Sequence, residues 1–148
     1  FNLTFNVLVA ISFRGDTPGI VEFGSLQVGT VEDTEDNIPS PALLQQDGNS
    51  LINVNLSSNN FLFATRSSTT ENYRFKVDTT DHTATDFNFS ESKTTYTNVT
   101  TTNDTIAIYD FNESSSQIEI EFNITVPPDE PSGVKTSLVL LQAYYKGR

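Results

Sequence analysis

Apolar residues alternate with mostly polar ones along the first segment of the chain, and this pattern constrains the fold more than any other. The apolar positions are Phe1, Leu3, Phe5, Val7, Val9, Ile11 and Phe13. Because side chains of a β-strand point alternately to opposite faces, these residues form one apolar face. At about 3.3 Å per residue the segment spans roughly 43 Å, about twice an ordinary strand. We therefore predict a long N-terminal strand whose apolar face is covered by its own domain or by a neighbouring molecule.

The rest of the sequence repeats this period-two pattern between turns. The main predicted strands are residues 20–28, 50–57, 61–64, 73–77, 87–90, 106–111, 117–126 and 134–145. The last of them is apolar on both faces, which is typical of a central strand. No segment has sustained helical periodicity. These features predict an all-β fold, an antiparallel β-sandwich of Ig-like or jelly-roll type, with the N-terminal strand 1–13 preceding a single domain, 14–148.

Charge and composition exclude several classes of partner. The chain has 19 acidic and 8 basic residues, a net charge of −11, so we expect neither nucleic-acid nor anionic-membrane binding. The absence of cysteine excludes disulfides and thiolate metal sites. No apolar run approaches the roughly 18 residues of a membrane span, so we expect no membrane insertion of the mature chain. The first residue is Phe rather than Met, which favours a chain secreted after removal of a targeting segment.

Asparagine glycosylation sequons are frequent, which favours a secreted surface glycoprotein. Seven asparagines begin an N-x-S/T tripeptide: Asn2, Asn55, Asn88, Asn98, Asn103, Asn112 and Asn123. Such tripeptides mark candidate N-linked glycans on exported proteins. The alternative is that a chain rich in asparagine, serine and threonine forms them by chance. The glycosylated interpretation predicts an extracellular location.

Acidic residues cluster in one polar stretch, which makes calcium a candidate ligand. The cluster consists of Glu32, Asp33, Glu35 and Asp36. Carboxylates on a loop can bind a hard cation such as Ca²⁺, but their spacing matches no EF-hand loop. Acidic loops are more often simply solvated. We therefore expect no cofactor apart from glycans, with calcium as the weaker hypothesis.

The sequence contains no recognisable catalytic motif. Its one histidine, His82, lies in a polar loop, and the sequence has no G-x-S-x-G, H-E-x-x-H or phosphate-binding glycine loop. Glu119 and Glu121 alternate with apolar residues of a predicted strand, so we interpret them as solubilising charges on its outer face. We predict that the protein is not an enzyme.

Two segments resemble those of secreted filament proteins. They are the first strand, FNLTFNVLVAISF, and the late hairpin, QIEIEFNITVPPDEPSGVKTSLVLL. Their layout resembles that of subunits of archaeal extracellular filaments (threads and bundling pili). It is also similar to the biofilm fibre proteins of the TasA and camelysin type. The chain has no long apolar N-terminal helix of the kind found in type IV pilins.

This resemblance implies assembly by donor-strand complementation. In that mechanism the N-terminal strand of one subunit fills a groove of the next by β-addition. The seven apolar residues of segment 1–13 match the donor strand, and the partner is another copy of the chain in a head-to-tail polymer. The alternative is a monomeric cell-surface, S-layer or carbohydrate-binding module.

Overall fold

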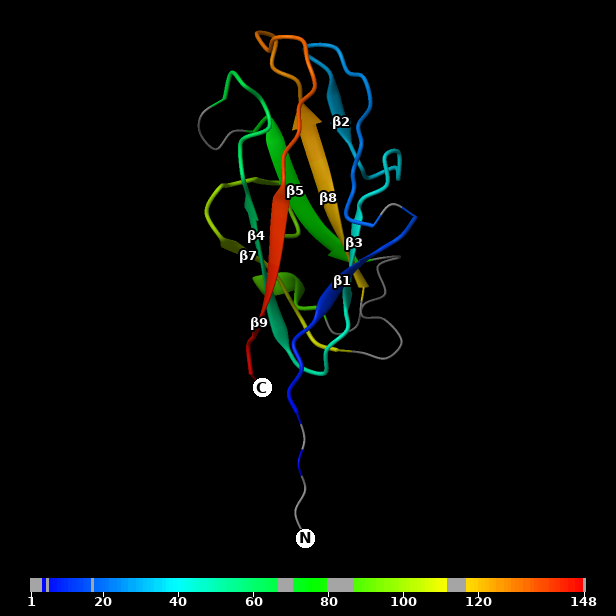
Figure 1. The fold of residues 1–148 in the computed structure, drawn as a ribbon, viewed down its shortest axis with the longest axis vertical. Coiled ribbons are helices and arrows are strands. Elements are labelled where there is room, and N and C mark those ends of the chain that lie inside the picture. Colours follow the sequence, from blue (N-terminus) through cyan, green and yellow to red (C-terminus); the bar gives the residue numbers. More distant parts are fainter. Residues whose placement is uncertain are drawn as a thin grey trace.

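The protein consists of two antiparallel β-sheets that face each other (Figure 1). The computed structural model describes residues 4, 6–16, 18–66, 71–79, 87–111 and 117–147. Within this part the only helix is a short 3₁₀ helix, η2 (Phe89–Glu91), whose N-cap is Asn88. No described helix is long and apolar enough to cross a membrane. The predicted all-β antiparallel sandwich is confirmed.

The larger sheet is built around strand β8. Its strands are β1 (Ile11–Arg14), β2 (Val31–Asp33), β3 (Ala42–Gln46), β5 (Tyr73–Thr79), β6 (Thr97–Asn98) and β8 (Gln117–Thr125). They are ordered β1-β3-β8-β5-β6, and β2 also pairs with β8. Ile118, Ile120 and Ile124 of β8 are buried, as their alternation predicts. β8 is the central strand of the fold.

The smaller sheet has the order β7-β4-β9. Its strands are β4 (Ile52–Ser58), β7 (Asp104–Tyr109) and β9 (Val139–Tyr145). The prediction that the last strand is central is wrong, because within the described residues β9 pairs with β4 alone and lies at the edge. Its inward residues, including Leu141, pack against the core, whereas Leu140 on the other face is 52% exposed. Strand β9 therefore has two apolar faces, only one of which is covered.

The long N-terminal strand is not confirmed, because β1 begins only at Ile11. Its pairing with β3 nevertheless continues in the same register, since Asp47 N–H donates to Ala10 O (2.9 Å) and Asn49 N–H to Leu8 O (3.1 Å). A Cβ atom on Gly48 would collide with the backbone oxygen of Leu8, so glycine allows this close approach. The described residues before Leu8 are exposed and extend past the end of the sandwich (Figure 1).

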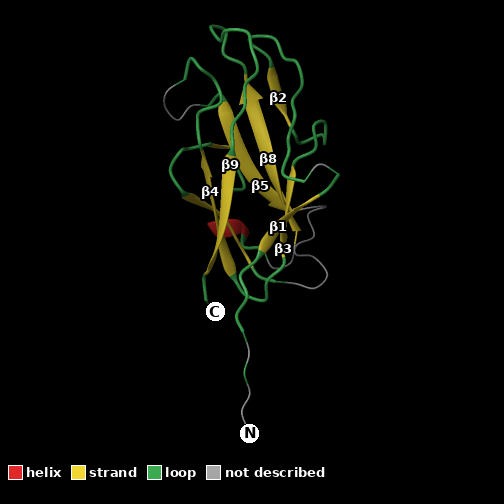
Figure 2. Cartoon of the chain, in the orientation of Figure 1, coloured by secondary structure: helices red, strands yellow, loops and turns green. Residues whose placement is uncertain are grey.

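Three shorter predicted strands are wrong for a local reason. Residues 20–28 have no strand and form an irregular segment along the larger sheet (Figure 2). Gly19, Gly24 and Gly29 have φ angles of +71°, +68° and +80°, which an extended strand does not tolerate. Residues 61–64 form bends and a turn, and residues 87–90 contain the isolated bridge from Phe87 to Tyr109 and the start of η2.

Candidate functional site

Strand β9 has an open hydrogen-bonding edge. Lys146 N–H donates to Leu51 O (3.0 Å) and Asn59 N–H donates to Leu138 O (3.0 Å), in the register of the β4–β9 ladder. Because hydrogen-bonded pairs alternate in an antiparallel ladder, the even-numbered residues of β9 bond to β4. The backbone groups of the odd-numbered residues, from Val139 to Tyr145, therefore point away from β4. No strand in the described part of the chain pairs with this edge.

The other sheet edges are shorter or covered. The far side of β7 accepts hydrogen bonds from Lys93 N–H to Ile106 O (2.8 Å) and from Asn88 N–H to Ile108 O (2.9 Å). Strands β1 and β6 have 4 and 2 residues, whereas β9 has 7. Unpaired edges are templates for pairing with another chain, and natural proteins usually shorten or cover them. Among the edge strands of the described part, β9 is therefore the longest.

An apolar groove of about 1220 Å³ lies beside the start of this edge, where Val139 and Leu141 line it. Its floor is the inner face of the larger sheet, which Figure 1 shows between β9 and the blue segment that precedes β2. The floor residues are Ala42, Tyr73, Ile120, Phe122 and Ile124, and the walls are residues 19–28, 130–139 and Leu141. Small-molecule pockets typically measure about 300–1,000 Å³, so this groove is large for one.

Apolar side chains also line the rim of the groove. Ile20 and Val28 on one wall, and Val134 and Leu138 on the other, are each more than half exposed. Exposed apolar groups gathered around one concavity are typical of an interaction site. Together with the open edge, they provide the two parts of β-strand addition, which are a main-chain ladder and pockets for alternate side chains.

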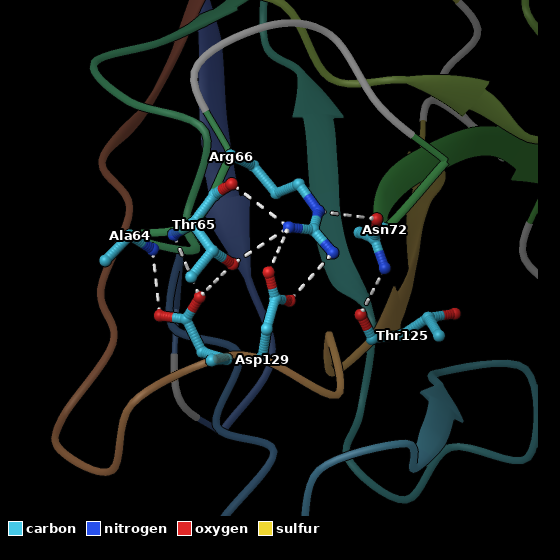
Figure 3. A network of polar contacts seen from close by, with 7 residues as sticks. Ala64, Thr65, Arg66, Asn72, Thr125 and Asp129 are labelled. Atoms are coloured by element: carbon cyan, nitrogen blue, oxygen red, sulfur yellow. Dashed lines mark hydrogen bonds and ion pairs between the residues drawn. The ribbon is translucent and has the colours of Figure 1, made fainter.

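The wall before β9 is held by a buried carboxylate, Glu130. It accepts hydrogen bonds from the backbone N–H groups of Ala64 (2.8 Å) and Thr65 (3.1 Å) and from the Thr65 hydroxyl (2.7 Å). Lys135 forms an ion pair with it at 2.6 Å. Figure 3 shows the Ala64 and Thr65 side of this cluster. These bonds attach residues 130–135 to the turn that follows β4.

A second polar contact ties the same turn to β8. Arg66 binds both carboxylate oxygens of Asp129, at 3.2 and 3.4 Å, and its Nε donates to Asn72 Oδ1 at 3.3 Å. Asn72 in turn donates to Thr125 O at 2.8 Å, at the end of β8 (Figure 3). This end of the groove is therefore held in place without a disulfide.

Replacement of Glu130 by glutamine should weaken the fold and change its pH dependence. Burial would raise the pKa of Glu130, but the bonds from Lys135, Thr65 and Ala64 lower it to about 2. Because the folded pKa lies below the ordinary 4.5, the carboxylate stabilises the fold above about pH 4.5 and loses this effect as the pH falls toward 2. In E130Q we expect the free energy of unfolding at pH 7 to be lower by about 1–3 kcal/mol. It should also fall less steeply than in the parent as the pH is lowered below about 4.5, as measured by urea unfolding at each pH.

The control for this prediction is D129N, because the side chain of Asp129 is 62% exposed. Exposed ion pairs contribute about 0–1 kcal/mol, so this variant should lose little stability. Equal losses in E130Q and D129N would contradict the role given to Glu130.

The outer face of β8 contains a buried carboxyl group that sequence analysis placed in solvent. Glu121 is 5% exposed and accepts a hydrogen bond from the Thr34 hydroxyl, so its interpretation as a solubilising charge is wrong. Thr34 and Glu35, which directly follow β2, contact this face at Glu121 and Lys76, a feature that alternation does not encode. Burial, followed by the nearby Glu119, raises the pKa of Glu121 to about 7, although the bond from Thr34 and the charge of Lys76 oppose the shift.

This carboxyl group should make the fold less stable as the pH rises. Its folded pKa lies above the ordinary 4.5, so its stabilising protonation is complete below about pH 4.5 and is lost as the pH rises through about 7. The isosteric variant E121Q keeps an acceptor for Thr34 and does not titrate. We expect it to be more stable than the parent by about 1–3 kcal/mol above pH 7. Identical pH profiles of the two proteins would contradict this assignment.

The predicted calcium ligands do not converge. Glu35 forms an ion pair with Lys76 (2.6 Å), and Asp33 and Asp36 accept hydrogen bonds from the backbone of residues 35 and 38. The fourth residue, Glu32, lies on β2. In the described part of the chain no three histidine, aspartate or glutamate side chains are placed to share a metal ion. The acidic cluster stabilises its own loop.

The sequon asparagines differ in accessibility. Asn103 is exposed, and Asn55, Asn88 and Asn98 are half-buried. Asn123 is 5% exposed and accepts a hydrogen bond from Arg74 (2.9 Å), so its burial argues against a glycan there. The other two predicted sites, Asn2 and Asn112, lie outside the described residues, as does His82.

The predicted donor residues fall into two groups. Phe1, Leu3 and Phe5 lie outside the described residues, and Val7 is 51% exposed. Val9 and Ile11 pack against the protein's own core, and Phe13 lies on β1 and lines the groove.

Comparison with family models, curated proteins and solved structures found no match to this chain.

Proposed function

We propose that this protein is the structural subunit of an extracellular filament, assembled by donor-strand complementation. The observation that carries the proposal is the open edge of β9 beside an apolar groove. A strand added there would become the fourth strand of the smaller sheet. It would cover the part of the larger sheet that β9 leaves open.

The N-terminal segment of a second copy has the composition that this groove requires. Residues 1–7 alternate between apolar Phe1, Leu3, Phe5 and Val7 and the polar Asn2, Thr4 and Asn6. The apolar side chains would face the groove, and the polar ones would face solvent. Val9, Ile11 and Phe13 belong to the donor's own subunit, so we propose a donor that ends at Val7.

Apolar burial and main-chain hydrogen bonds together can stabilise this contact between subunits. Full burial of an apolar side chain of this size contributes about 1.5–3 kcal/mol, and the donor would bury four of them. Association costs an estimated 4–15 kcal/mol, so hydrogen bonds along β9 are needed in addition. Pairing would also remove two exposed strand edges.

The contact joins different surfaces of the two copies and therefore does not close on itself. Such heterologous contacts propagate into filaments unless a rotation closes them into a ring. A subunit with a filled groove still has its own N-terminal segment, and its neighbour still has a groove. The sequons, Asn103 above all, support an extracellular location, and intact mass before and after deglycosylation tests their occupancy.

The experiment that tests the function is electron microscopy of the full-length chain over a range of concentrations, combined with sedimentation velocity. We expect filaments whose length increases with concentration. A compact monomer at the highest concentration would contradict the proposal.

A further inference from the structure

We infer that the donor strand runs antiparallel to β9 of the neighbouring subunit. Residues 1–14 then form one strand shared by two subunits, with residues 1–7 in the neighbour's smaller sheet and residues 8–14 in the larger sheet of their own. This inference rests on the proposed function and adds the direction and anchoring of the donor.

The anchor is the ladder between the N-terminal segment and β3. Leu8 and Asn49 are joined twice, because Leu8 N–H donates to Asn49 Oδ1 (2.8 Å) and Asn49 N–H donates to Leu8 O (3.1 Å). Asn49 Nδ2 also donates to Asn6 O (3.0 Å). With Gly48 allowing close contact at Leu8, the segment is attached to its own subunit from about Leu8 onward. Residues before that point have few bonds to their own subunit in the described part.

The topology defines the direction of the donor. Strand β1 is antiparallel to β3, which is antiparallel to β8, so β1 and β8 run in the same direction. The chain turns back after β8, and β9 runs the opposite way, toward the end of the sandwich where the residues before β1 emerge (Figure 1). An N-terminal segment that continues straight from β1 is therefore opposite in direction to β9.

The N-terminal segment and β9 of the next subunit remain opposite in direction when subunits stack along the long axis. If subunits are related by rotation about that axis and translation along it, the donor of one subunit lies antiparallel to β9 of the next. If a two-fold axis inverts the second copy, the donor is parallel to β9, and two copies exchange strands in a closed dimer. Strand direction thus distinguishes an open filament from a closed pair. All strand pairs in the described part of the chain are antiparallel.

Length and register also agree with this arrangement. Residues 1–7 span about 23 Å in extended form, and β9 has 7 residues. With the odd-numbered donor residues facing inward, Phe5 and Val7 lie opposite Leu141 and Val139 of the groove wall, and Asn2, Thr4 and Asn6 lie on the outer face. There they flank the outward residues of β9, which are Leu140, Gln142 and Tyr144.

Paired cysteines test the direction, because the chain has no cysteine of its own. Cysteine replaces Asn2, Thr4 or Asn6 in combination with Leu140, Gln142 or Tyr144, and intersubunit disulfides are measured by mass under mild oxidation. Directly opposed positions in a ladder have Cβ atoms about 4.5–5.5 Å apart, close enough for a disulfide after a small shift. The antiparallel arrangement predicts crosslinks from Asn6 to Leu140 and from Asn2 to Tyr144.

Two other results would overturn the inference, in distinguishable ways. Crosslinks from Asn2 to Leu140 and from Asn6 to Tyr144 would establish a parallel donor, leaving strand exchange intact but contradicting the direction. Absence of crosslinks at all nine combinations, in a chain that remains monomeric, would contradict the proposed function itself. Thr4 lies opposite Gln142 in both the antiparallel and the parallel pairing. A crosslink between these two positions is therefore the positive control for disulfide formation at the contact.

Discussion

A variant that begins at Leu8 is expected to fold but not to polymerise. The described residues that it loses, Thr4, Asn6 and Val7, are exposed, so the free energy of unfolding should change by less than about 1 kcal/mol. The groove should remain empty, because the donor is missing. Sedimentation velocity should show a monomer at concentrations where the full chain forms filaments.

The control is a variant that begins at Arg14. It lacks Val9 and Ile11, which pack against the core, and the ladder to β3. We expect it to be destabilised by several kcal/mol. If the variant beginning at Leu8 still forms filaments, the donor does not lie in residues 1–7.

Proline at Ala143 is expected to block assembly from the acceptor side. The N–H of Ala143 points away from β4, so proline removes no bond within the smaller sheet, and proline is tolerated at such edge positions. It removes a donor to the incoming strand and places a ring in its path. We expect near-parental stability and a loss of polymer of at least tenfold, measured as the pelleted fraction.

The matched control is Q142P, one residue earlier. Gln142 bonds to β4 in the register that places it opposite Asn55, so proline there removes a bond within the subunit. We expect a loss of about 2 kcal/mol or more in the free energy of unfolding. If the two prolines destabilise the protein equally, the assignment of the even-numbered residues of β9 to the ladder with β4 is wrong.

Sequence patterns identify the strands that are covered on one face. β8 alternates because Ile118 and Ile120 face the core while Glu119 faces away, and strands β4 and β5 follow the same rule. The same rule misplaced β9. Leu140 and Leu141 read as a strand buried on both faces, yet only Leu141 packs against the core. An apolar residue that awaits a partner looks the same in a sequence as one that already has one.

Long-range contacts account for the remaining errors. The N-terminal strand is divided at Leu8 because, in the described part of the chain, the backbone ladder to the turn around Gly48 reaches only as far as Leu8, and hydropathy does not encode this. Glu121 is buried because a distant loop brings Thr34 over it. The groove could not be predicted either, since much of its walls comes from residues 20–28 and 134–139, which the sequence pattern interprets as parts of ordinary strands.

The most direct test of the central claim is residue-by-residue amide hydrogen exchange of β9. It compares the assembled full-length chain with the monomer that begins at Leu8. The N–H groups of Val139, Leu141 and Ala143 should exchange rapidly in the monomer and slowly in the assembled chain, because the donor bonds to them. Those of Leu140 and Gln142 should be protected in both, because they bond to β4. Equal exchange of the odd-numbered residues in both states would contradict the account.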